Sequence, residues 1–221
     1  MKIKAIITGA SGMVGEGVLH ECLINPNVEQ VLVIGRKPCG HSHPKLKELI
    51  HNDFFNITTI KEQLLGYNAC YFCAGVSSVG MNEAEYFRLT YEMTIHFATV
   101  LAQVCPELAF CYISGTGTDS TEKGKIMWTR VKGKTENDLM KLPFKNVFCF
   151  RPGVLTPTTG LKNTLSFYKY LGWLIPVIKI VFPGRITSLT QLGDAMINIS
   201  LSGYSTQIIE VQDIKKLANR I

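Results

Sequence analysis

The stretch "TGASGMVG", residues 8–15, is the strongest indication of fold in this chain. It follows the apolar run "KAII" and opens a segment with helical spacing of apolar residues. In such a strand–loop–helix unit the first glycine permits a tight turn, the second lets the backbone approach a pyrophosphate, and the third lets helix and strand pack closely. The helix N-terminus adds free N–H groups and positive dipole. The stretch therefore predicts a dinucleotide-binding loop formed by Thr8, Gly9, Ser11, Gly12, Met13, Val14 and Gly15.

The rest of the chain alternates between short apolar runs and segments of helical periodicity. We expect strands at residues 4–9, 30–35, 69–75, 109–115, 146–153 and 207–212. Helices are expected at residues 14–23, 83–104, 191–201 and 213–220. Regular alternation of strand and helix is typical of βαβ units with right-handed crossovers. The sequence thus predicts one α/β domain over residues 1–221, a doubly wound, mostly parallel sheet of the Rossmann type.

Composition narrows the class of protein. The 221 residues are 46% hydrophobic and 18% charged, which is typical of a folded chain large enough for a real core. The net charge of +6 comes from scattered cations, so we expect no nucleic-acid partner. Seven cysteines, an odd number, lie mostly in apolar runs, and the N-terminus lacks the features of a signal peptide. These features favour a reducing compartment, the cytoplasm.

The spacing Gly-x-x-Gly-x-x-Gly after a threonine resembles that of the extended and atypical short-chain dehydrogenases/reductases. The likeness covers nearly the whole chain and is strongest to the NmrA-like and Tat-interacting-protein-like oxidoreductases. A Walker-type phosphate loop does not fit, because no Gly-Lys-Ser/Thr follows the glycines. The resemblance implies an NAD(P)-binding oxidoreductase acting on a small carbonyl-type substrate.

Two basic residues, Arg36 and Lys37, stand at the end of the second expected strand. An acidic residue there would bind the ribose 2′-hydroxyl of NAD, whereas a basic one accommodates the 2′-phosphate of NADP. The alternative is that both side chains are only solvated. The position favours NADP(H) as cofactor, with NAD(H) as the second candidate.

Further cofactor contacts are implied by the resemblance. Asp53 and Phe54 follow the expected third strand, where the family places an acidic side chain near the adenine; a helix N-cap is the alternative for Asp53. Ala74 and Gly75 match the family's turn after the fourth strand. Pro152 and Gly153 match the turn that closes over the nicotinamide, although the pair also suits an ordinary turn.

The resemblance implies a catalytic serine after the fifth strand, then a tyrosine and, four residues later, a lysine. Here Ser114 and Lys132 stand at these positions, and Trp128 replaces the tyrosine. One helical turn separates Trp128 from Lys132, so both face the same site. An indole donates a hydrogen bond but has no ionisation like that of a phenol, which titrates at about pH 10, so Trp128 cannot shuttle the proton.

Three hypotheses follow from this replacement. Water or the hydroxyl of Tyr91, Thr116 or Tyr168 supplies the proton, with weak activity. Alternatively the cofactor binds without turnover, as in a redox sensor or regulatory protein. The third alternative is a local misalignment in which Lys134 or Tyr112 matters, although Tyr112 lies inside a strand and suits the core.

The remaining features concern partners. Residues 156–185 are irregular and would lie beyond the carboxyl ends of the strands, as a substrate-side lid or contact segment. Their apolar part, residues 170–182, suits a hydrophobic substrate, a homo-oligomer contact or, less well, a membrane surface.

We expect no metal site. Cys70 and Cys73 point to opposite faces of a strand, and no second cluster of ligands completes a four-ligand site with residues 39–43.

Overall fold

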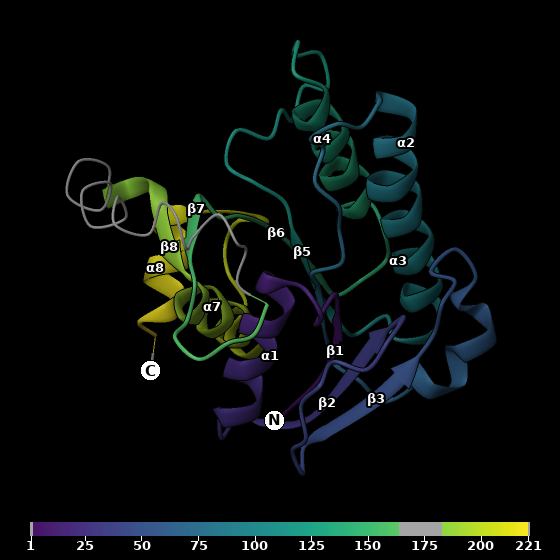
Figure 1. Cartoon of the computed structure of the whole chain (residues 1–221), viewed down its shortest axis with the longest axis vertical. Helices are drawn as coiled ribbons and strands as arrows, with labels where there is room; N and C mark the ends of the chain where they lie inside the picture. Colours follow the sequence, from purple (N-terminus) through teal and green to yellow (C-terminus); the bar gives the residue numbers. More distant parts are fainter. Residues whose placement is uncertain (1, 164–182, 221) are drawn as a thin grey trace.

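The computed structural model describes residues 2–163 and 183–220. Their centre is a parallel sheet of seven strands in the order β3-β2-β1-β4-β5-β6-β9 (Figure 1). Each strand pairs in parallel with its neighbours. The strands are β1 (Ile3–Thr8), β2 (Val28–Gly35), β3 (Leu46–Ile50), β4 (Ala69–Phe72), β5 (Ala109–Ile113), β6 (Asn146–Arg151) and β9 (Ile208–Glu210). The prediction of a doubly wound Rossmann-type domain is confirmed.

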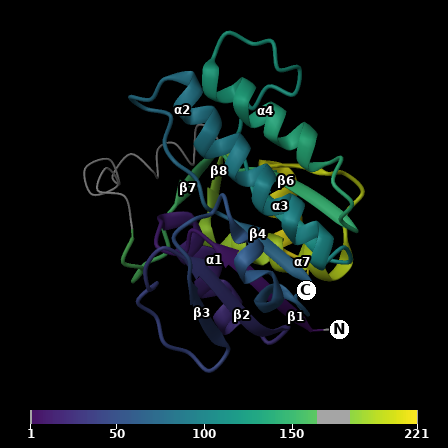
Figure 2. The ribbon, with the colours of Figure 1, turned by 90° about the vertical axis from the view of Figure 1, so that its right-hand side faces the viewer.

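Helices cover both faces of the sheet. One face carries α1 (Met13–Ile24), α7 (Leu189–Ser202) and α8 (Val211–Ala218). The other carries the 3₁₀ helix η1 (Ile57–Leu64), α2 (Glu83–Phe87), the π turn η2 (Arg88–Glu92), α3 (Met93–Val104) and α4 (Met127–Leu139). Figure 2 has this second layer in front, with α3 and α4 lying over the sheet. A separate parallel pair, β7 (Val154–Thr156) and β8 (Ile186–Ser188), lies beside the sheet, and β8 follows the short 3₁₀ helix η4 (Pro183–Arg185).

The apolar runs form strands because both of their faces are buried. In β1, Ile7 packs in the core shared with α1 and α7, while its neighbour Ile6 packs in the core shared with η1 and α3. The same alternation separates Cys70 from Cys73, which contact opposite cores, as expected. All seven cysteines are free thiols.

Several element boundaries differ from the sequence-based expectation. The long helix at residues 83–104 is real but contains the π turn η2. The last strand, expected at residues 207–212, ends at Glu210, because the Glu210 side chain caps α8 together with Asp213 and so starts the helix at Val211. A capping box between Ser188 and Gln191 likewise starts α7 two residues before the expected boundary.

The glycine loop joins β1 to α1 where the strand order reverses between β1 and β4. Gly9 has a φ of +71°, a left-handed conformation that side chains disfavour, and a Cβ there would lie 2.6 Å from the Cys73 carbonyl oxygen. A Cβ on Gly15 would lie 2.2 Å from the Gly9 carbonyl oxygen. These glycines therefore let α1 pack directly on the loop.

Replacement of Gly15 by alanine is expected to lower the free energy of unfolding by about 1–3 kcal/mol, because the new methyl group would overlap rigid backbone. Gly12→Ala is the matched control. A Cβ at Gly12 meets only the Gly9 carbonyl oxygen at 3.5 Å, so we expect a cost below about 1 kcal/mol, the usual penalty at a helix N-cap. Urea unfolding measures both, and equal losses would contradict the packing argument.

Candidate functional site

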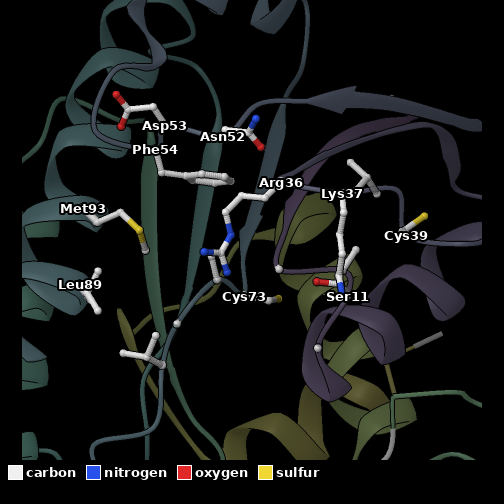
Figure 3. Close-up of a pocket in the computed structure, with 18 of the residues that line it drawn as sticks. Ser11, Arg36, Lys37, Cys39, Asn52, Asp53, Phe54, Cys73, Leu89 and Met93 are labelled. Carbon is white, nitrogen blue, oxygen red and sulfur yellow. The ribbon is translucent and has the colours of Figure 1, made fainter. Parts of the chain in front are cut away.

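A cavity of about 350 Å³ opens at the carboxyl ends of β1, β2 and β4 (Figure 3). This edge, at the reversal of strand order, is where open α/β sheets bind ligands. The lining combines the glycine loop, the two basic residues after β2, the segment after β3 and the turn after β4. Its residues include Gly9, Ala10, Ser11, Gly12, Arg36, Lys37, Cys39, Asn52, Asp53, Phe54, Cys73, Ala74, Gly75, Leu89 and Met93.

The glycine loop has the geometry of an anion cradle. Gly12 is the N-cap of α1, and no side chain caps that helix end. The space beyond Gly12 is open, since an added Cβ would touch only one atom at ordinary contact distance. Thr8 Oγ1 accepts a hydrogen bond from the Ala74 N–H at 3.1 Å and so fixes the turn after β4 against the loop. These features fit a pyrophosphate bound on the first turn of α1.

The two basic residues after β2 lie at the cavity, as expected. In Figure 3, Arg36 extends into the cavity and Lys37 extends toward the glycine loop at Ser11. Both side chains are exposed. Within residues 2–163 and 183–220, neither forms an ion pair or a hydrogen bond, so both cations remain available to an anionic group.

Asp53 and Phe54 are both at the cavity but in different roles. The Asp53 carboxylate points away from the cavity in Figure 3 and accepts a hydrogen bond from the Phe55 N–H at 2.9 Å. This contact closes a local turn at residues 53–55 and is not the helix N-cap given as the alternative for Asp53, because η1 begins at Ile57 with Asn56 as its N-cap. Asp53 still lines the cavity, and its contact with an adenine stays a prediction. The buried Phe54 ring stacks on Phe97 and forms an apolar wall.

Several residues that line the cavity were not expected from the sequence, among them Cys39, Asn52, Leu89 and Met93. Leu89 and Met93 are four residues apart on one helical path, which places them on the same face. That spacing is present in the sequence, but it cannot distinguish a ligand-facing position from a core position. Only the packing of η2 and α3 against the sheet shows where this face lies.

Ser114, Trp128 and Lys132 lie around the turn that follows β5. The buried Ser114 hydroxyl lies 3.0 Å from Thr118 Oγ1. The Trp128 ring packs on this turn, since a Cβ on Gly115 would lie 3.6 Å from its Cζ3 atom. Lys132 Nζ donates a hydrogen bond to the Ile113 carbonyl oxygen at 3.1 Å. Thr118 was not expected from the sequence.

The ammonium group of Lys132 is in an unusual environment. It is partly buried and lies 5.2 Å from the centre of the Tyr112 ring. Burial lowers the pKa of Lys132 from 10.5 to about 8, and the attraction of Glu136 and Cys149 opposes this only in part. Near neutral pH the group is therefore charged but close to its titration midpoint.

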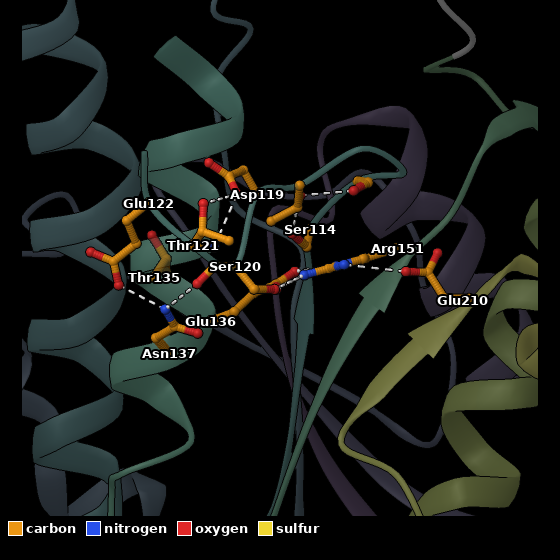
Figure 4. A network of polar contacts seen from close by, with 12 residues as sticks. Ser114, Asp119, Ser120, Thr121, Glu122, Thr135, Glu136, Asn137, Arg151 and Glu210 are labelled. Carbon is orange, nitrogen blue, oxygen red and sulfur yellow. Dashed lines mark hydrogen bonds and ion pairs between the residues drawn. The ribbon is translucent and has the colours of Figure 1, made fainter. Parts of the chain in front are cut away.

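A polar network holds the helix that carries Trp128 and Lys132 (Figure 4). Arg151, at the end of β6, binds both carboxylate oxygens of the fully buried Glu136 on α4, with a distance of 3.0 Å from Nε to Oε1. The same guanidinium contacts Glu210 of β9 and Ser120 Oγ of the loop before α4. Bidentate pairing restricts both rotation and sliding of α4. The network thereby fixes the position of Lys132, one turn before Glu136.

The alternative proton donors and lysines have other partners in the structure. The Tyr91 hydroxyl donates to Asp138 Oδ2 at 2.8 Å, and Lys134 Nζ binds the same carboxylate at 2.8 Å. Burial and this carboxylate raise the pKa of Tyr91. Tyr112 is buried in the core, as expected.

Thr116 is exposed, and its Oγ1 donates a hydrogen bond to the Arg151 carbonyl oxygen. Tyr168 lies outside the described residues.

The turn after β6 has a clear structural role. A Cβ on Gly153 would lie 2.0 Å from the Arg185 carbonyl oxygen, because β7 and β8 approach closely at this point. This packing accounts for Gly153 without a ligand, and contact of Pro152 or Gly153 with a nicotinamide stays a prediction. The lid was expected at residues 156–185. Residues 164–182 of this segment, which include the apolar stretch 170–182, lie outside the described residues.

Two other kinds of site are absent from residues 2–163 and 183–220. No helix within them is long and apolar enough to cross a membrane. They also contain no group of three or more His, Cys, Asp or Glu side chains arranged to hold a metal ion.

The fold and the cradle together define a dinucleotide-binding protein of the Rossmann type. A family model described as "NAD dependent epimerase/dehydratase family" matches residues 5–122, more than half of the chain. The chain therefore belongs to the NAD-dependent epimerase/dehydratase family, the extended branch of the short-chain dehydrogenases/reductases.

Individual relatives are distant but extend over most of the chain. Protein FMP52, mitochondrial, from Candida albicans is 22% identical and spans 99% of this chain and 100% of its own. Protein HTATIP2 from Rattus norvegicus is 25% identical and covers 70% of this chain and 64% of its own. These are atypical, NmrA-like members of the superfamily, as the sequence analysis expected.

The fold is also similar to that of solved enzymes. The Bordetella bronchiseptica enzyme WbmF, solved in complex with NAD+, superimposes with a TM-score of 0.68 at 13% identity, covering 98% of this chain and 76% of that one. At this level of identity the likeness establishes the fold only. NAD(P) binding is typical of the family, and the cavity described above fits it.

The environment of Lys132 predicts its titration. With isotope-labelled lysine side chains, the signal that disappears in Lys132→Arg is expected to titrate at about pH 8, protonated below and neutral above this value. Lys134 is the internal control, because its hydrogen bond to Asp138 raises its pKa above the usual 10.5. Nuclear magnetic resonance titration measures both, and a midpoint near 10.5 for Lys132 would contradict the burial argument.

Proposed function

We propose that this protein is an atypical short-chain oxidoreductase that prefers NADP(H) and acts on a carbonyl-type substrate. The observation that supports it best is the pair Arg36 and Lys37, two cations without an acidic partner in the described structure, beside an open glycine cradle. Both cations border the cavity that the glycine loop also lines, and a bound adenosine with its pyrophosphate at this loop would have its ribose near the end of β2. A 2′-phosphate on that ribose is the anionic group that the two cations would bind.

Each part of the site has a task in this proposal. The N–H groups at the start of α1 bind the pyrophosphate, and the apolar wall of Phe54, Leu89 and Met93 receives the adenine. The nicotinamide, when bound, supplies or accepts a hydride. Ser114 orients the substrate oxygen, and Lys132 holds the ribose hydroxyls.

Trp128 supports a second candidate function. With no phenol beside Lys132, the site holds a cofactor more readily than it exchanges a proton, so the protein would act as a sensor or regulator of the NADP(H) pool. The two functions share the binding site and differ only in turnover.

The other expectations are part of this proposal. Seven free thiols favour a reducing compartment, and we propose the cytoplasm; the relative from Candida albicans has "mitochondrial" in its name, and cell fractionation separates these two locations. We further propose a small, hydrophobic substrate and no nucleic-acid partner. We propose that residues 170–182 contact the substrate or a second copy of the chain; contact of this stretch with a membrane surface is the weaker alternative, which vesicle flotation tests.

The cofactor preference is tested by binding. Arg36→Ala is expected to weaken NADPH binding roughly ten- to hundredfold, the usual effect of losing a hydrogen bond between charged groups, and to leave NADH binding nearly unchanged. Fluorescence titration of Trp128 and Trp173 reports both. Arg220→Ala, which removes a cation stacked on Tyr204 near the C-terminus, is the control. Equal affinity of the native protein for NADPH and NADH would refute the 2′-phosphate assignment.

Turnover is tested at position 128. If the phenol is the missing group, Trp128→Tyr is expected to increase NADPH oxidation with aldehydes, ketones or quinones by about 10²- to 10⁴-fold. Trp128→Phe, which has no donor, is the matched control for the change in size. If native protein and Trp128→Tyr both bind NADPH but neither oxidises it with any of these substrates, the sensor function replaces the oxidoreductase.

A further inference from the structure

A carboxylate directly behind the glycine loop binds two separate segments. Glu16 follows Gly15 in the first turn of α1 and is only 1% exposed. Its Oε1 accepts the Lys162 N–H at 2.9 Å, and its Oε2 accepts the Asn163 N–H at 2.7 Å. His41 Nε2 lies 3.2 Å from Oε1. A buried carboxylate with three such partners is a strong, directional tie.

The hydrogen-bond partners of Glu16 stabilise its ionised form. Burial alone would raise the pKa of Glu16, but the N–H groups of Lys162 and Asn163 and the His41 ring outweigh it and lower the pKa. The positive end of the α1 dipole acts in the same direction. Glu16 is therefore an anion in the folded protein at neutral pH.

One of the two tied segments carries the proposed cofactor selector. This segment, residues 36–43, which we call the selector loop, begins with Arg36 and Lys37 and includes His41. It is also held at Cys39, whose N–H donates to Glu48 of β3 at 2.7 Å. The Glu16–His41 contact thus fixes the far end of the loop that carries the two free cations.

The other tied segment comes from the opposite half of the chain. After β7, residues 157–163, which we call the crossover, run past α7 to the N-terminal end of α1 (Figure 1). Leu161 packs on the core beneath α1. Lys162 Nζ also reaches the Gly40 carbonyl oxygen at 3.2 Å, so the crossover contacts the selector loop directly. Glu16 lies at the junction of both segments.

We propose that Glu16 is a positioning residue that couples the selector loop to the crossover, so that binding of the 2′-phosphorylated cofactor and ordering of the crossover support each other. This inference rests on the proposed NADP(H) site. Because coupling between two sites is reciprocal, a nucleotide that engages Arg36 and Lys37 stabilises the bonds from Glu16 to Lys162 and Asn163. NADH, which lacks the 2′-phosphate, does so less.

Amide hydrogen exchange of the full chain, combined with nucleotide titration, tests the coupling. In the native protein, NADPH is expected to slow exchange in the crossover more than NADH does. In Glu16→Gln, the crossover amides are expected to exchange faster without nucleotide, the extra protection by NADPH to disappear, and the preference for NADPH over NADH to fall by about fivefold or more.

Three further variants make the test specific. Glu21→Gln is the matched control, since Glu21 is also a buried acid on α1, 4% exposed, but lies beside Gly193 of α7. It is expected to change neither readout. His41→Ala removes the contact between Glu16 and the selector loop, whereas Lys162→Ala removes the Nζ contact with the Gly40 carbonyl oxygen and keeps the backbone bond from Lys162 to Glu16. Neither side chain is buried, so both variants should reduce the NADPH preference without unfolding the protein.

The outcomes separate this inference from the proposed function. If NADPH binds preferentially but Glu16→Gln keeps both the crossover protection and the NADPH preference, the coupling is refuted and the NADP(H) site stands. A general loss of stability with an unchanged NADPH preference also refutes it, because that is the result of a purely structural role. If neither nucleotide binds the native protein, the proposed function fails and the coupling with it.

Discussion

The close approach of backbone to backbone at the glycine loop is the constraint on which the rest of the structure depends. Gly15 brings α1 onto the Gly9 carbonyl, and Gly9 in turn lies against the turn after β4. No side chain larger than hydrogen fits at either place. The free N–H groups of α1 consequently point across the edge where the strand order reverses, and Glu16 one residue later is buried behind them.

A second constraint acts on the other side of the sheet. α4 is held by the bidentate pair between Arg151 and Glu136, and by Gly133, at which a Cβ would overlap the Asp119 carbonyl oxygen. The helix thus presents Trp128 and Lys132 to the turn after β5, where the proposed function places the reacting groups. The indole at position 128 lacks an ionisable proton comparable to that of a phenol. In the proposed function, cofactor binding and turnover therefore depend on different side chains.

The carboxylate of Glu16 also connects the two halves of the chain. Glu16 is an anion enclosed by the selector loop and the crossover, and a buried anion is tolerated only while its partners stay in place. This explains why a polar group can remain inside a tightly packed region next to the cofactor cradle. It also gives residues 157–163 a fixed place beside α1, although their sequence has no regular pattern.

Sequence patterns alone are enough to predict the parallel sheet, the glycine loop and the two cations after β2. These follow from local rules, namely apolar runs of strand length, glycines at fixed offsets and charges at a strand end, and the structure has each of them where expected. The family resemblance implied that Ser114 shares a site with Trp128 and Lys132, and all three lie around the turn after β5. Local sequence patterns predict less well where each strand and helix begins and ends. At Glu210, for example, a side-chain cap of α8 ends β9 earlier than expected.

The packing of the folded chain, by contrast, is needed to show which side chains share an environment. Leu89 and Met93 have the spacing of core residues, and they line the cavity because η2 and α3 place that face there. Tyr91 is paired with Asp138, Glu136 with Arg151, and Glu16 with amides 146 and 147 residues away along the chain. Partners so far apart in sequence leave no periodic signal, because their proximity is created by the packing of the sheet and its two helix layers.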